Sequence, residues 1–202
     1  LLLTALGWLA SGRDAVRTLF GMPHPAINVV LLKLKDLLQR DPGRVRARFL
    51  LGRALNDQGD YAGAENEFRR AAALGYSADD VAPMLARALL YQGKLDELGE
   101  EPLLNLAKDP VAQAGVLTSR ASALLARGEA DRALSMLERA LQLAPTAGEP
   151  KAAMGNFLID RGRLEDAASL MSAGLEADPR SSVLNLAFGA YQRASGRPDE
   201  AV

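Results

Sequence analysis

Five glycines recur along the chain at an almost constant interval, and no other sequence feature constrains the fold more. The intervals between them are 34, 35, 34 and 34 residues. Glycine suits the end of a helix because it adopts the left-handed conformation there without steric cost. A small residue also stands seven positions before each glycine. The glycines are Gly59, Gly93, Gly128, Gly162 and Gly196, and the small residues are Gly52, Ala86, Ala121, Gly155 and Gly189.

The unit at residues 45–78 shows what lies between the repeated positions. Apolar residues recur at spacings of three and four on both sides of Gly59, which indicates two helices joined by a tight turn. Antiparallel helices approach closely only where their side chains are small, so Gly52 and Ala64 mark the expected crossing. The apolar positions of the two helices are Phe49, Leu51 and Leu55, then Tyr61, Phe68 and Ala71.

This register resembles the tetratricopeptide repeat family, whose unit is a 34-residue helix–turn–helix. The resemblance covers residues 26–202 and implies an all-α fold, a right-handed α-solenoid of paired antiparallel helices. A generic helical bundle is the alternative. The expected organisation is an apolar N-terminal helix plus a degenerate leading repeat at 1–44, followed by units 45–78, 79–113, 114–147, 148–181 and a partial 182–202.

Two units are expected to depart from the pattern. In unit 79–113 Leu98 replaces the small residue of the second helix, and Gly99 and Pro102 interrupt it, so this helix is predicted to be short or irregular. The leading repeat has a second-helix pattern at 26–40 that ends at Asp41-Pro42. Its predicted packing positions are Val30, Leu34 and Leu37.

Residues 1–10 are almost wholly apolar but too short to span a bilayer, which needs about twenty residues. No initiator methionine precedes them, which suggests that the chain begins inside a longer one. We expect an ordered helix that packs on the first repeat or docks on a membrane or a partner. Its predicted docking residues are Leu2, Leu3, Leu6, Trp8 and Leu9.

The net charge of −1 hides an uneven distribution. Residues 1–53 carry nine Lys or Arg against three Asp, whereas residues 54–202 carry fifteen against twenty-two acids. A basic N-terminal segment can face an anionic membrane or an acidic partner. The plainer interpretation is that these basic side chains lie on a solvated helix face. No aromatic platform interleaves with the basic residues, so nucleic acid is not an expected partner.

Side chains for catalysis are missing from the sequence. There is no cysteine, and the single histidine, His24, lies between two prolines in an expected turn. No phosphate-binding glycine loop or nucleophile motif is present. The adjacent acids Asp79-Asp80 and Glu100-Glu101 diverge on a helix and are interpreted as solvated or helix-start residues. The sequence therefore predicts a protein that is not an enzyme and has no cofactor or metal.

The family resemblance implies that the first helices of the units line a partner-binding face. Arg53 and Arg87 occupy the same position in adjacent units, and guanidiniums bind carboxylates through paired hydrogen bonds. We therefore expect a protein or peptide partner with an acidic segment, while a hydrated face without a dedicated ligand is the alternative. The residues predicted to bind are Arg46, Phe49, Arg53, Asn56, Arg87, Tyr91, Asn156 and Arg193.

A narrower resemblance concerns about 50 residues. Residues 47–98 look like the front of tetratricopeptide lipoproteins of bacterial PEP-CTERM/exosortase exopolysaccharide systems, and the resemblance is carried by Leu74-Gly75-Tyr76 and by residues 81–90, VAPMLARALL. The cysteine that would carry a lipid anchor is absent. This resemblance implies a scaffold for assembly or export in the bacterial envelope, membrane-associated on the periplasmic side. A soluble cytoplasmic peptide-binding adaptor is the alternative.

Overall fold

The computed structural model describes residues 24–196, which form ten α-helices, one 3-10 helix and no strand. The predicted all-α class is therefore confirmed over this part of the chain. The chain divides into two compact units, with the boundary between Tyr76 and Ser77. Unit 1 contains α3, α4 and α5, and unit 2 contains the helices from α6 to α12.

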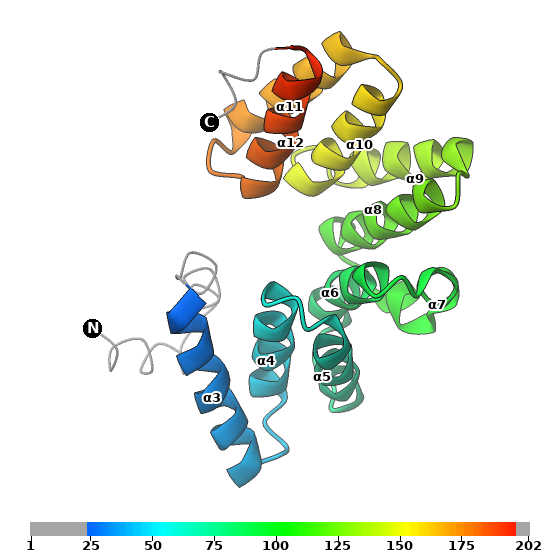
Figure 1. The fold of residues 1–202 in the computed structure, drawn as a ribbon. Coiled ribbons are helices and arrows are strands. Elements are labelled where there is room, and N and C mark those ends of the chain that lie inside the picture. The colour runs from blue at the N-terminus through cyan, green and yellow to red at the C-terminus, as the bar shows by residue number, and fades with distance from the viewer. Residues whose placement is uncertain (1–23, 197–202) are drawn as a thin grey trace. The chain divides into compact units, whose positions relative to one another are not determined.

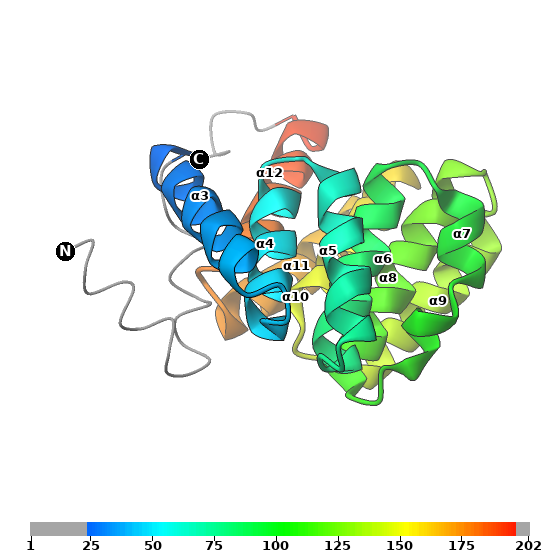
Figure 2. The ribbon, with the colours of Figure 1, turned by 90° about the horizontal axis from the view of Figure 1, so that it is seen from below.

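In unit 1, α4 packs against both of its neighbours and lies between them (Figures 1 and 2). The buried residues of α3 are Leu31, Leu34 and Leu38. Of the predicted packing positions, Leu34 is correct, but Val30 and Leu37 are only half-buried, because the buried face is centred one residue further along. The helices are α3 (His24–Arg40), α4 (Val45–Asp57) and α5 (Tyr61–Ala73). His24 thus begins a helix rather than lying in a turn.

The α4–α5 crossing depends on Gly52, as predicted. A Cβ atom on Gly52 would lie 2.8 Å from the ring of the fully buried Phe68 and 3.3 Å from the carbonyl oxygen of Ala64. A Cβ atom does not approach a non-bonded ring carbon so closely, so glycine permits this packing without a shift of Phe68. On the same pair of helices Arg48 forms an ion pair with Glu67 at 2.9 Å, and both side chains are largely buried.

Unit 2 holds the regular repeats 114–147 and 148–181. In Figure 1, α8 and α9 lie side by side, and α10 packs against both α11 and α12. Ala121, Ala133, Leu137, Leu158 and Ala167 belong to one buried cluster that spans the helices of two repeats. The helices are α8 (Pro110–Ala126), α9 (Ala130–Leu143), α10 (Gly148–Asp160), α11 (Leu164–Ala177) and α12 (Ser182–Ala194). All five predicted turn glycines have φ between +71° and +83°.

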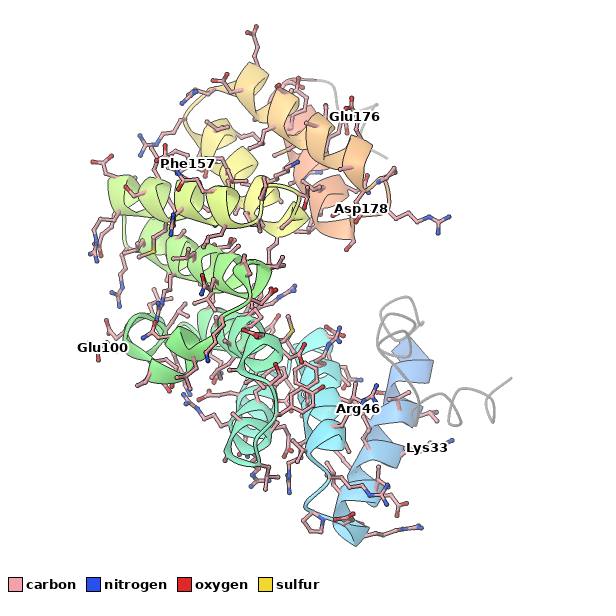
Figure 3. All side chains as sticks on the ribbon, turned by 180° about the vertical axis from the view of Figure 1, so that it is seen from behind. Lys33, Arg46, Glu100, Phe157, Glu176 and Asp178 are labelled. Carbon is pink, nitrogen blue, oxygen red and sulfur yellow. The ribbon has the colours of Figure 1, made fainter. Side chains whose placement is uncertain are left out.

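The repeat at 79–113 is irregular where the sequence predicts it. Its first helix, α6 (Ala78–Tyr91), is complete, and Asp79 and Asp80 lie in its first turn as expected. The second helix, α7 (Leu95–Glu100), has only six residues and ends at Glu100, labelled in Figure 3. A 3-10 helix, η2 (Pro102–Leu106), takes its place.

Two side chains hold this irregular segment. The Asp79 carboxylate accepts hydrogen bonds from the backbone N–H groups of Lys108 and Asp109. These bonds lower the pKa of Asp79 below its ordinary value of 3.8, because they favour the charged form. The Nε of Arg120 on α8 donates to the carbonyl oxygen of Leu98 at 3.1 Å. Side chains thus replace hydrogen bonds that a full second helix would make itself.

Candidate partner-binding site

The first helices of unit 2 are α6, α8, α10 and α12, and each packs against the next in this order. Equivalent positions of consecutive repeats are therefore neighbours. We call the surface formed by these positions the first-helix face of unit 2. It consists of Asp80, Pro83, Arg87, Leu90 and Tyr91 on α6, Gly115, Thr118, Ser122, Leu125 and Ala126 on α8, Glu149, Ala152, Asn156, Ile159 and Asp160 on α10, and Val183, Leu186, Ala190, Arg193 and Ala194 on α12.

Gly115 is the point at which three of these helices meet. A Cβ atom placed on it would lie 3.0 Å from the Cβ of Pro83 on α6 and 3.9 Å from Oε2 of Glu149 on α10. Next to it, Thr118 and Ala152 are buried. The Thr118 hydroxyl donates to the carbonyl oxygen of Ala114 at 2.8 Å, so its hydrogen is already used within α8. Small side chains form the floor of the face here.

The charges on the face are arranged around Glu149. Partial burial raises the pKa of this carboxyl group, and the positive charge of Arg87 opposes that rise. Arg87 itself is exposed, with its guanidinium 5.7 Å from the centre of the Tyr91 ring. Arg87 is therefore available to a ligand carboxylate, but that carboxylate would compete with Glu149. The sequence places both residues on this face without revealing that they interact.

Exposed apolar side chains extend the face. Tyr91 is 54% exposed and Leu186 is 73% exposed. Val183, one turn from Leu186, is 39% exposed. Four predicted binding residues, Arg87, Tyr91, Asn156 and Arg193, are exposed on these helices. Val183 and Leu186 occupy first-helix positions that the family resemblance assigns to the binding face, and their apolar character distinguishes them there.

The predicted binding residues of unit 1 need correction. Phe49 is buried, stacked on Tyr76 with ring centres 4.5 Å apart, and therefore belongs to the core rather than to an accessible surface. Asn56 is also buried. The guanidinium of Arg53 lies 5.8 Å from the Phe49 ring centre. Arg46 lies on α4 (Figure 3). It lines a pocket with Leu34 and Leu37 of α3.

Other predicted residues belong to separate units or lie outside the described part of the chain. Arg53 belongs to unit 1 and Arg87 to unit 2, so their joint use by one peptide stays a prediction. The apolar residues 1–10, including Trp8, lie outside the described residues. Within residues 24–196, no helix is both long and apolar enough to cross a bilayer. The same residues contain no cluster of three or more His, Cys, Asp or Glu that could hold a metal ion.

Comparison with known proteins decides the family. Two models described as tetratricopeptide repeat match residues 32–80 and 124–187, together more than half of the chain. This chain is a tetratricopeptide repeat protein. The predicted solenoid fold class is confirmed, and tetratricopeptide repeats serve as scaffolds for protein–protein interaction. The interval between the two matches contains α7 and η2, the irregular part of the array.

Two solved structures, those of TTC0263 and MamA, share the fold at TM-scores above 0.5. The protein TTC0263 of Thermus thermophilus is 20% identical, with a TM-score of 0.64 over 84% of this chain and 90% of its own. MamA is 19% identical, with a TM-score of 0.51 over 75% of this chain and 88% of its own. YrrB, described as having an unusual peptide-binding site, is 18% identical, with a TM-score of 0.48 over 87% of this chain and 89% of its own. No curated protein matches the chain.

Proposed function

We propose that this tetratricopeptide protein is a non-enzymatic scaffold that holds an extended peptide of a partner protein on the first-helix face of unit 2. The observation that carries the proposal is the combination of a floor of small buried residues with exposed Arg87, Tyr91 and Leu186 around it. Small floor residues allow a main chain to approach closely. Exposed aromatic, arginine and aliphatic side chains are the types that anchor partners.

The arrangement suggests the chemistry of the peptide. Arg87 on α6 favours a carboxylate, whereas Leu186 and Val183 on α12 favour aliphatic side chains. Three helix steps of about 8–10 Å separate α6 from α12, which gives about 25–30 Å. An extended strand rises about 3.3 Å per residue, so roughly eight or nine residues cover this distance. The proposed ligand is therefore a peptide with acidic residues at one end and leucines at the other.

Binding of a labelled nine-residue peptide tests this proposal. The peptide carries two glutamates at one end and two leucines at the other. It is synthesised once with the glutamates at the N-terminus and once with the leucines there, and its binding is measured by fluorescence anisotropy. Arg87→Gln should weaken binding about tenfold or more, since a hydrogen bond to a charged group is worth about 1.5–3 kcal/mol. Leu186→Asp should also weaken binding. Arg132→Gln on α9 and Leu74→Asp in unit 1 are the matched controls, and equal losses in the controls would contradict the assignment.

Glu149 provides a second test with the opposite sign. Because its carboxylate competes for Arg87, Glu149→Gln should tighten the binding of the acidic peptide while leaving a peptide with glutamine in place of glutamate unaffected. Weaker binding of the acidic peptide to Glu149→Gln would show that Glu149 organises the site instead of competing with the ligand.

The cellular setting forms a finer part of the proposal. The resemblance to PEP-CTERM/exosortase lipoproteins, the apolar residues 1–10 and the basic residues 1–53 favour a membrane-associated scaffold of the bacterial envelope. Deleting residues 1–10 should then reduce recovery of the protein in the membrane fraction. Added salt should weaken the electrostatic membrane association that remains. Recovery of the unaltered protein only from the soluble cytoplasm would favour the alternative, a cytoplasmic peptide-binding adaptor.

A further inference from the structure

A pocket of about 280 Å³ lies in unit 2 where the short α7 gives way to η2. We call it the η2 pocket. Its walls combine aliphatic and cationic side chains from η2, α8 and α9, and it shares no residue with the first-helix face. Its lining residues are Leu104, Asn105, Ala107, Gln113, Val116, Leu117, Arg120, Arg139 and Leu143.

The guanidinium of Arg120 is held in place within this pocket. Its Nε donates to the carbonyl oxygen of Leu98, and one terminal nitrogen donates to Oδ1 of Asn105, both at 3.1 Å. Partial burial lowers the pKa of Arg120 because it removes water from the charged group. A guanidinium fixed in this way is ready to receive an anion with little further loss of side-chain freedom.

Arg139 adds a second positive charge from α9. It donates to Oε1 of Gln142 one turn along the same helix, and its side chain is otherwise exposed. Among the described residues, neither Arg120 nor Arg139 has a carboxylate within ion-pair distance, although several other arginines of the array are paired, such as Arg132 with Glu129. The pocket therefore carries two positive charges that the described part of the chain does not neutralise.

The remaining surface of the pocket is aliphatic. Leu104 and Val116 are buried, and Leu117 and Leu143 are partly exposed in its walls. Leu106 and Val111 follow closely along the chain and are 57% and 59% exposed, so apolar surface continues outside the pocket. The volume falls just below the roughly 300–1,000 Å³ typical of pockets for drug-sized ligands. It suits one or two residues of a peptide.

The geometry points to a second binding site, in which the η2 pocket receives the C-terminal end of a partner polypeptide with an aliphatic last residue. A terminal leucine or valine carries its carboxylate and its branched side chain on a single Cα. Such a residue offers a carboxylate to the two arginines that line the pocket and a side chain to its leucine walls. The exposed Leu106 and Val111 then contact the residues before the terminus, which a small free acid would not reach.

The probes for this site are N-acetyl-leucyl-leucine with a free carboxylate, the same dipeptide as its C-terminal amide, and octanoate. Each is titrated into the full-length, isotope-labelled protein, and backbone amide shifts are followed by NMR. We expect the free acid to shift resonances of Leu104, Val116, Arg120 and Arg139. The amide should bind about tenfold more weakly or worse, because it loses the charge-assisted hydrogen bonds.

Two charge reversals on the same helix serve as a matched pair. Arg139→Glu should abolish binding of the free acid, whereas Arg132→Glu, which changes the net charge equally but does not line the pocket, should retain it. The comparison of acid and amide on the unaltered protein keeps the test decisive if either variant fails to fold.

Three results would overturn the inference. Equal affinity for acid and amide would show an apolar pocket without carboxylate recognition. Shifts confined to residues away from η2 and α8 would place the binding elsewhere. Tighter binding of octanoate than of the dipeptide acid at these residues would mean that the pocket selects a free aliphatic acid instead of a polypeptide end.

Discussion

Two repeats of unit 2, 79–113 and 148–181, share one register but differ in their second helices. In both, the small residue of the first helix is buried, Ala86 in one and Gly155 in the other. The equivalent second-helix positions, Leu98 and Ala167, are fully buried. Yet α11 runs for 14 residues, while α7 ends after six. The array therefore keeps its crossing point even where most of a helix is lost.

The difference shows what a tetratricopeptide repeat needs and what it can omit. Leu98 fills the crossing by itself, and side chains from neighbouring elements, Asp79 and Arg120, bind the backbone that the missing helix leaves unpaired. In the regular repeat, the fully buried Met171 packs against Gly155 at the crossing. In the irregular repeat, the cationic and aliphatic η2 pocket lies where most of the second helix is lost.

The largest effect is expected from Gly155→Leu in the regular repeat. Even a Cβ atom at this position would overlap Cε of Met171 and lie 3.0 Å from its Cγ, and Met171 is fully buried. Overpacking should cost about 1–3 kcal/mol of unfolding free energy. Urea denaturation measures it, with Gly155→Ala expected to cost less. An unchanged midpoint for the leucine variant would mean that the crossing lies elsewhere.

Removing the side chain that supports the irregular repeat should cost somewhat less. Arg120→Met preserves length but leaves the Leu98 carbonyl oxygen without its hydrogen bond, a loss of about 1–2 kcal/mol. Arg139→Met, which supports no backbone group, is the control. If both variants unfold at the same urea concentration, Arg120 is not what stabilises the end of α7.

Strengthening the short helix should act in the opposite direction. Gly99 lies in α7, and a Cβ atom on it would meet nothing within 4 Å. Gly99→Ala should therefore stabilise the protein by about 0.5–1 kcal/mol, because alanine loses less conformational freedom on folding into a helix. A lower melting temperature for this variant would reveal a neighbour that crowds the position.

The smallest effect concerns pH and Asp79. Because its pKa is lower in the folded protein, the ionised carboxylate stabilises the fold above the unfolded-state value, and this contribution is lost as the pH falls through the folded-state value. Asp79→Asn should therefore be less stable than the parent at pH 7 and nearly equal to it in strong acid. Asp80→Asn, the exposed neighbour, should show no such convergence. Parallel stability curves for Asp79→Asn and its parent would refute the role.

Much of the fold could be predicted because the glycine register fixes where helices pair. The irregular second helix could be predicted as well, because Gly99 and Pro102 interrupt a helix within their own segment. The accessible site residues were harder to identify. Both sides of α4 are rich in apolar residues, so periodicity alone does not show that Phe49 faces Tyr76 instead of solvent. The Arg87–Glu149 interaction and the η2 pocket arise from residues far apart in sequence, which one helix's pattern does not reveal.

The left-handed glycine that ends each first helix also has a genetic consequence. A DNA segment copied from the codon of Gly128 to that of Gly162 would insert a unit whose two junctions already match its new neighbours. Unequal recombination can therefore lengthen or shorten such an array without creating a new joint. A copy taken from Gly93 to Gly128 would instead duplicate the short α7 with η2 and Arg120. The choice of crossover point would decide whether a descendant gains a regular repeat or a second irregular one, the latter without a second copy of Arg139 on α9.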